Sequence, residues 1–160
     1  MNYLLHQLSK RDVERLVPLL STTSYDRRKN TIWAFRLDRH TSAYLIDKKT
    51  PFLVEVHGDI VPYINSASHF EAMLSKFFVD QGAADRVIEG ADLMSPGVTR
   101  YELNFKTKLG VVYSPAVEAI AVGKLDADAD SKLQQRHGKV LFNLHHRGDW
   151  IHRAVAEVTG

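Results

Sequence analysis

The sequence predicts an α+β fold whose first half contains an antiparallel sheet with helices. Four stretches rich in β-branched and aromatic residues follow one another between residues 31 and 63, with only short turns between them. Stretches with the periodicity of amphipathic helices come before and after these strands. Further along, a short helix and a turn with glycine precede a strand that ends at Ser95-Pro96-Gly97, so both kinds of element continue into the second half.

The first helix is expected to begin after Ser9. Ser9 is a residue type that caps helices, and apolar residues between Val13 and Leu20 recur at the spacing of one helical face. Pro18 lies within this stretch, and a proline inside a helix breaks or kinks it. A loop rich in Ser, Thr and charged residues is expected at residues 21–30.

The antiparallel meander is expected to occupy residues 31–37, 43–47, 51–56 and 60–63. His57-Gly58-Asp59 is the predicted tight turn before its last strand. A second amphipathic helix is predicted at residues 67–76, because four large apolar residues share one helical face: Phe70, Met73, Leu74 and Phe77.

A short helix at residues 81–90 begins with the small residues Gly82, Ala83 and Ala84. Small side chains at a helix start let another backbone come close, and the first amide groups of a helix have no partner within it. Such groups attract anions, phosphate among them. This corner is therefore a candidate site for a nucleic-acid backbone.

The order of residues from Phe78 to Val98 resembles the PUA domain family, an RNA-binding module named after pseudouridine synthases and archaeosine transglycosylases. The resemblance continues through Ala-Val-Gly-Lys at residues 121–124 and through Asn-Leu-His-His-Arg-Gly-Asp-Trp at residues 143–150. It implies a small β pseudobarrel with one or two short helices. We therefore expect a pre-PUA-like α+β domain at residues 1–77, packed on a PUA domain at residues 78–160.

This two-part layout is itself similar to the malignant-T-cell-amplified-sequence family of translation factors and its archaeal relatives. The similar stretch includes Pro51-Phe52-Leu53 and residues 60–63. The resemblance implies a non-catalytic protein that binds tRNA or rRNA in translation or ribosome assembly, with the small ribosomal subunit or a translation factor as a further partner. Two alternatives stay open: a protein-interaction module of the translation machinery, and a targeting component of an RNA-modifying enzyme.

In PUA domains the RNA surface generally comprises the helix, the glycine turn with the strand after it, and the last hairpin. Carried over onto this sequence, the resemblance implies RNA contacts at Gly82, Ala83, Arg86, Gly90, Ala91, Met94, Ser95, Pro96, Gly97 and His145. Basic and aromatic residues alternate along residues 99–108, as in an exposed ribbon, and add Arg100, Lys106 and Lys108 to this set. Here the chain departs from the family, because Gly110-Val111 stands where the family usually has Gly-Asp.

Other patterns favour structural roles. The spacing of Asp126, Asp128 and Asp130 is that of a calcium loop, but Ser131 and His137 stand where the loop needs Gly and Glu. These acidic residues are expected instead to cap a short helix at residues 130–136.

The last motif of the chain also indicates structural roles. Adjacent strand residues such as His145 and His146 point to opposite faces, and Trp150 is expected to anchor the last strand in the core. The sequence has no cysteine, and it contains none of the common hydrolase, nucleotide-binding or zinc-protease motifs. We therefore expect no catalytic residue, no metal site and no cofactor.

Composition is that of an ordinary globular protein. Of 160 residues, 44% are hydrophobic and 25% are charged, and the net charge is only +2. RNA binding is therefore expected to depend on shape and on a local basic patch. No apolar run is long enough to span a bilayer, and the N-terminus lacks the pattern of a secretion signal, so we expect a cytoplasmic protein without a membrane partner.

Overall fold

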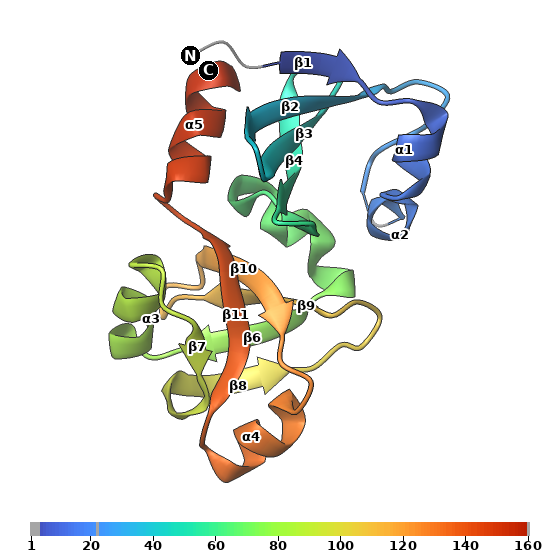
Figure 1. Cartoon of the computed structure of the whole chain (residues 1–160). Helices are drawn as coiled ribbons and strands as arrows, with labels where there is room; N and C mark the ends of the chain where they lie inside the picture. Colours follow the sequence, from blue (N-terminus) through green and yellow to red (C-terminus); the bar gives the residue numbers. More distant parts are fainter. Residues whose placement is uncertain (1–3, 22, 160) are drawn as a thin grey trace.

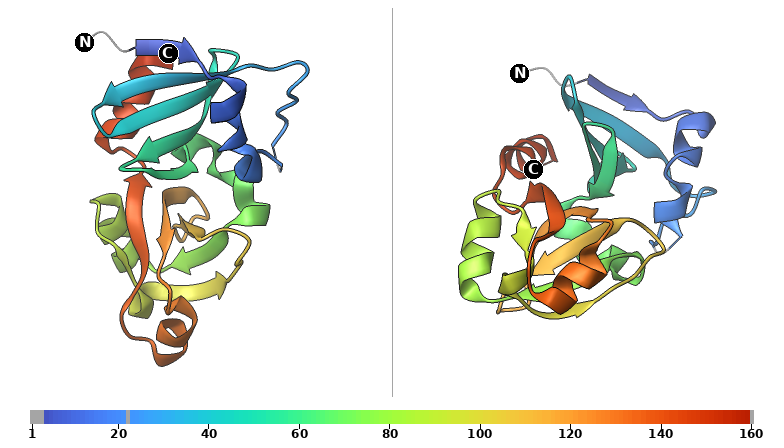
Figure 2. Two further views of the ribbon diagram at one scale, coloured as in Figure 1. Left: turned by 45° about the vertical axis from the view of Figure 1, so that its right-hand side comes forward. Right: turned by 60° about the horizontal axis from the view of Figure 1, so that its bottom comes forward.

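A computed structural model describes residues 4–21 and 23–159 of the chain (Figure 1). The strands form two sheets, one with five strands from the first half of the chain and one with six strands from the second half. Short helices lie beside each sheet (Figures 1 and 2). This arrangement confirms the predicted α+β class.

The first half forms an antiparallel meander, as predicted. Its strands pair in the order in which they follow in the chain. The strand nearest the N-terminus was not predicted. The elements are β1 (Leu4–Gln7), α1 (Lys10–Glu14), α2 (Val17–Leu20), β2 (Ile32–Asp38), β3 (Thr41–Ile46), β4 (Thr50–Val56) and β5 (Asp59–Pro62).

The two short helices of the first half confirm the cap and the proline break. The Ser9 side chain accepts a hydrogen bond from the backbone N–H of Asp12 at 3.2 Å, which satisfies one free donor at the start of α1. The helix ends before Leu16, and Pro18 lies in the first turn of α2, where its missing N–H does no harm. Leu16, Leu19 and Leu20 are buried in the core beside the first sheet.

The helix predicted at residues 67–76 is wrong in type and in extent. The structure has a 3₁₀ helix, η1 (Ile64–Met73), followed by strand β6 (Ser75–Val79). Burial alternates along β6, with Phe77 inside and Phe78 partly exposed, because this strand lies between two others in the second sheet. The apolar spacing of a short stretch does not distinguish a helix from a strand, and strand pairing decided between them.

The second half forms a curled sheet with the strand order β7-β11-β10-β9-β6-β8, in which only β6 and β9 pair in parallel. Its elements after β6 are α3 (Gln81–Ile88), β7 (Leu93–Met94), η2 (Ser95–Gly97), β8 (Val98–Glu102), β9 (Leu109–Tyr113), β10 (Ala119–Leu125), α4 (Ala129–Gln135), β11 (Lys139–His146) and α5 (Trp150–Thr159). The edge strands β7 and β8 are joined by only three residues of η2. The two edges therefore lie close together, and the sheet curls into a pseudobarrel.

Residue 123 must be a glycine because the backbones of β10 and β11 lie too close together there for a side chain. It lies at a register shift between β10 and β11, where a Cβ atom would come within 1.8 Å of the carbonyl oxygen of Phe142. No other residue fits there without displacing β11. This explains the glycine in the Ala-Val-Gly-Lys motif.

The role predicted for Trp150 is wrong. Strand β11 is followed by a turn and by α5, whose first residue is Trp150, and this side chain is 44% exposed. The next residue, Ile151, and Val155 one turn later fill the core beside the first sheet instead. Helix α5 thus ties the end of the chain back to its first half (Figure 1).

The two sheets share one apolar core. The cluster that contains Leu53 and Phe70 of the first part also contains Val111 and Val122 of the second sheet. Because the sheets meet through buried side chains, their relative orientation is defined by packing. The division between residues 77 and 78 stays a proposal, and it falls within β6, all of which pairs in the second sheet.

Candidate nucleic-acid interface

The start of α3 carries a carboxylate where a phosphate was predicted to bind. Asp80 is the N-cap residue, and its Oδ1 accepts a hydrogen bond from the N–H of Ala83 at 2.8 Å. An anionic ligand would compete with this carboxylate for the same donors. An acidic residue just before a helix is an N-cap pattern that the sequence itself contains.

Four residues of the predicted site are buried, and three of them, Ala83, Ser95 and Gly97, pack beneath the surface between α3, η2 and α4. A Cβ atom on Gly97 would lie 2.5 Å from the Cβ of Ala83, so both residues are small because α3 and η2 touch here. Ser95 is also buried, and its hydroxyl donates to the carbonyl of Lys132 at 2.7 Å. Substitutions at these positions would test packing and not RNA contact.

His145 belongs to the junction between the two sheets and is fully buried. Its Nε2 accepts the backbone N–H of Ile64 at 3.1 Å, and its Nδ1 lies 2.8 Å from Asp149 Oδ2. Its ring stacks on Tyr63, with 5.6 Å between centroids. His146 is partly exposed, so the two histidines do face different surroundings. The side chain of His145 has no surface to offer RNA.

Asp149 holds this junction through its charge. Burial acts to raise the pKa of Asp149, but the hydrogen bond from His145, together with the backbone N–H groups of His152 and His146, lowers the pKa below its usual value. The carboxylate therefore stays ionised although it is largely buried. It also caps the first turn of α5.

Six residues of the predicted site lie on an exposed surface, which we call the helix–turn face: Gly82, Arg86, Gly90, Ala91, Met94 and Pro96. Arg136, at the end of α4, joins it by donating from Nη2 to the carbonyl of Pro96 at 3.2 Å. The sequence showed Arg136 only as the end of a helix. Because Asp80, Asp85 and Glu89 are also exposed here, three carboxylates offset the positive charge of Arg86 and Arg136 on this face.

The remaining predicted residues lie elsewhere. Arg100 is on β8, where its guanidinium lies 3.9 Å from the centroid of the Phe78 ring. Lys106 and Lys108 are in the loop that joins β8 to β9, on the opposite side of the second sheet from α3 (Figure 2). The thirteen predicted residues therefore do not form one surface.

The loop at residues 103–108, which we call the aromatic loop, presents Phe105 with 73% of its area exposed. The loop is anchored to the end of η1 and the start of β6: the Asn104 side-chain amide donates to the carbonyl of Ala72 at 2.7 Å, and the Thr107 hydroxyl donates to the carbonyl of Met73. An exposed aromatic ring between lysines on a well-anchored loop is suited to stacking on an unpaired base.

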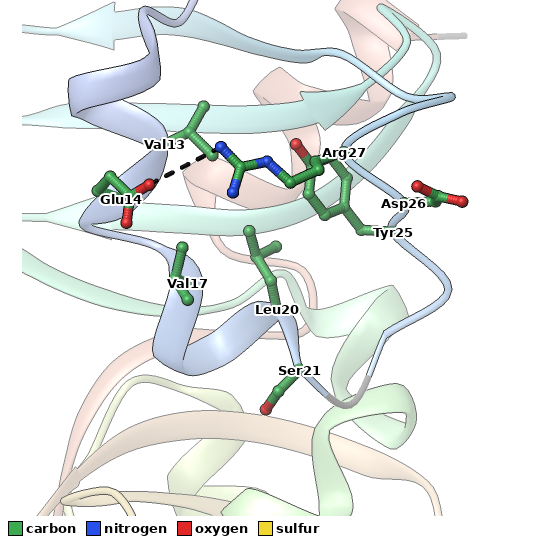
Figure 3. A pocket seen from close by; sticks show the side chains of 8 residues that line it. All are labelled: Val13, Glu14, Val17, Leu20, Ser21, Tyr25, Asp26 and Arg27. Atoms are coloured by element: carbon green, nitrogen blue, oxygen red, sulfur yellow. Dashed lines mark ion pairs between the residues drawn. The ribbon is translucent and has the colours of Figure 1, made fainter.

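A third feature is an apolar hollow between α1, α2 and the loop at residues 23–30, with a volume of about 490 Å³ (Figure 3). Val13, Val17, Leu20 and Tyr25 contribute its apolar lining. The Glu14 carboxylate and the Arg27 guanidinium, 4.0 Å apart, face each other across it.

Metal binding and membrane insertion have no visible basis in the described residues. Residues 4–21 and 23–159 contain no group of three or more His, Asp or Glu side chains that could hold a metal ion. Within the same residues, no helix is both long and apolar enough to cross a membrane.

The curled six-stranded sheet with its short helices is the architecture of a PUA domain, and residues 75–146 match the model of that family. Residues 75–146 are therefore similar to PUA domains, as the sequence motifs predicted. A PUA domain is a non-catalytic RNA-binding module, so this match indicates RNA binding.

Individual relatives extend the similarity over most of the chain. Malignant T-cell-amplified sequence 1-B of Xenopus laevis is 23% identical over 129 residues, which cover 78% of this chain and 71% of that protein. The human protein malignant T-cell-amplified sequence 2 is 24% identical over the same length and coverage. The predicted resemblance to this group is confirmed at low identity.

Solved structures show the same fold over both sheets. A conserved PUA domain protein from Thermoplasma acidophilum is 25% identical with a TM-score of 0.70, and the match covers 94% of this chain and 99% of that one. A hypothetical protein from Pyrococcus horikoshii has a TM-score of 0.76 at 21% identity, with the same coverage.

Proposed function

We propose that this protein is a non-catalytic RNA-binding protein that recognises tRNA or rRNA and acts in translation or ribosome assembly. The observation that carries the proposal is the match of residues 75–146 to the PUA domain. The similarity to malignant T-cell-amplified sequence proteins supports a role beside the small ribosomal subunit or a translation factor. A cytoplasmic location is part of the same proposal.

In this proposal, two exposed surfaces contact different parts of the RNA. The helix–turn face receives the RNA backbone, with Arg86 and Arg136 as the residues that contact phosphate. The aromatic loop contacts an unpaired nucleotide through Phe105, and Lys106 and Lys108 lie beside it. The modest net charge of +2 fits recognition by shape and stacking better than binding by overall charge.

A filter-binding titration with tRNA over a range of salt concentrations tests the proposal. We expect Arg86→Glu combined with Arg136→Glu to weaken binding at least tenfold and to lower the dependence of affinity on salt. Arg153→Glu is the matched control, because Arg153 is exposed on α5, away from both surfaces. Equal affinities for wild type, control and double variant would exclude the helix–turn face, and failure of wild type to bind any structured RNA at low salt would exclude the function.

The second candidate function is a protein-interaction module of the translation machinery. The apolar hollow favours it, because a partner could bury an apolar side chain there. Among the described residues, Arg28 and Lys29 beside the hollow form no ion pair, so the partner segment would be acidic as well as apolar. If this is correct, Val17→Asp removes capture of one defined partner from nuclease-treated extract and leaves tRNA binding unchanged.

A further inference from the structure

A polar pocket lies at the end of the first sheet, outside the residues that match the PUA domain. It has a volume of about 470 Å³ and lies where the turn between β2 and β3 meets the turn between β4 and β5. We call it the histidine–arginine pocket, and its lining consists of His6, Arg36, Arg39, His40, Thr41, Ser42, Glu55, His57 and Gly58. Two guanidinium groups and three imidazoles thus surround one hollow.

The two turns are fastened to each other. The backbone N–H of His57 donates to the carbonyl of His40 at 2.9 Å. The imidazole rings of these two residues stack, with centroids 4.9 Å apart and an interplanar angle of 22°. His57 adopts a positive φ of 49°, which is uncommon for a residue other than glycine. The position of both rings at the pocket is therefore fixed by the backbone.

Arg36 holds the first of these turns from within. Its Nε donates to the carbonyl of Asp38 at 3.2 Å, and its Nη2 donates to the carbonyl of Arg39 at 3.4 Å. The Asp38 carboxylate accepts the N–H of His40 at 2.8 Å. Across the described part of the chain Arg39 forms no ion pair, and it is exposed. Arg39 is thus a cation at the edge of the pocket that is free to bind a ligand.

Two of the three carboxylates near the pocket are paired with cations, and the third, Asp38, accepts backbone N–H groups of the turn. Glu55 accepts from Arg15 at 2.8 Å and from the Tyr44 hydroxyl at 3.2 Å. Asp59, beside Gly58, pairs with Lys124 at 3.8 Å. With these charges compensated, the donors of the lining favour an anion.

We propose that the histidine–arginine pocket binds a phosphate group. A guanidinium group such as that of Arg39 can donate two parallel hydrogen bonds to phosphate oxygens, and imidazole and hydroxyl groups add further donors. Arg36 contributes mainly its positive charge, because its Nε and Nη2 are already bonded to the turn. The phosphate could belong to an RNA backbone or to a free nucleotide. The inference goes beyond the proposed function, because it assigns a ligand site to the first sheet and requires no RNA contact by the PUA domain.

The test is a titration followed by NMR of the backbone amides of His40, His57 and Gly58. The probes are inorganic phosphate, adenosine monophosphate and a short single-stranded RNA. Two variants change the lining: Arg39→Gln removes a positive charge, and His57→Asn removes an imidazole but keeps a residue type that tolerates the positive φ. Arg28→Gln is the matched control, because Arg28 is an exposed arginine in the loop outside the pocket.

We expect saturable shifts at these amides, with affinity about tenfold weaker in each pocket variant and unchanged in the control. Saturation by RNA alone identifies the backbone as the source, and saturation by phosphate or adenosine monophosphate identifies a small ligand. If no probe gives saturable shifts, or if the pocket variants bind as the control does, the site is refuted. Loss of tRNA binding in the helix–turn double variant with retained phosphate shifts would separate this site from the proposed function.

Discussion

Asp149 joins the last helix to the junction between the two sheets, and Asp149→Asn tests how much this link stabilises the fold. Its Oδ2 lies 2.8 Å from His145 Nδ1 and accepts the N–H of His146 at 2.9 Å, and its Oδ1 accepts the N–H of His152 at 2.7 Å. Asparagine retains one acceptor oxygen and replaces the other by an NH₂ group. In either orientation of the amide, this NH₂ group would face N–H groups that now donate to Asp149, those of His145 and His146 or that of His152.

The expected loss follows from these contacts. Hydrogen bonds to a charged group contribute about 1.5–3 kcal/mol each, and asparagine oriented for the helix cap loses the two bonds made by Oδ2. Allowing for partial relaxation, we expect the free energy of unfolding to fall by about 3 kcal/mol. A domain of this kind is stable by about 5–15 kcal/mol in total, so the variant should still fold.

Urea unfolding followed by far-UV circular dichroism measures this change. Asp130→Asn is the matched control, since Asp130 is an exposed aspartate in the first turn of α4 and should change stability by less than about 0.5 kcal/mol. A loss below about 1 kcal/mol for Asp149→Asn, or one equal to the control, would refute the view that this carboxylate holds the junction.

The pH dependence gives an independent check on Asp149. Because its pKa is lowered in the folded protein, its stabilising effect is fully present above the unfolded value of about 4 and is lost as pH falls through the folded pKa. Wild-type stability should therefore decline more steeply below about pH 4 than that of Asp149→Asn. Parallel curves for the two proteins would contradict the assignment.

Three further predictions concern other parts of the chain. Burial, followed by the charge of Arg147, lowers the pKa of His152 in the folded protein. Wild-type stability should therefore fall as pH drops below about 6.5. In urea titrations, His152→Gln should show a smaller decline over the same pH range. Gly123→Ala should destabilise the protein by about 3 kcal/mol or more in the same assay, since its Cβ would overlap a backbone carbonyl, and a loss under 1 kcal/mol would contradict this. Asp80→Asn should keep the N-cap of α3, because asparagine also caps helices. It should strengthen tRNA binding about two- to fivefold at low salt, because it removes a negative charge from the helix–turn face. Unchanged affinity in filter binding would indicate that the RNA binds elsewhere.

Much of the fold could be predicted because its signals are local. Ser9 and Pro18 mark the start and the break of the first helical segment, and alternating residues between short turns mark the meander. The helix predicted at residues 67–76 included the first two residues of β6, because the apolar spacing of a short stretch does not show which segments it will pair with. Pairing with β8 and β9, distant in the chain, made residues 75–79 a strand.

The site residues could be predicted only in part, because a sequence motif is also a local signal. The motif around Gly82 and Gly97 identified a PUA domain correctly. Motif position does not show exposure, however, and Ala83, Gly97 and His145 proved to be buried. Arg136 was missed because only the contact of α4 with η2 brings it to the helix–turn face.

The sequence by itself determined the class of fold, the antiparallel meander of the first half and the PUA motifs, since caps, turns and the alternation of apolar residues act over a few positions. Only the tertiary structure decided which charged and aromatic residues share a surface. Curling of the second sheet placed α3 and the loop between β8 and β9 on opposite sides (Figure 2), and the contact of α4 with η2 brought Arg136 beside Pro96. Such proximity depends on strand pairing between distant residues, which no local pattern records.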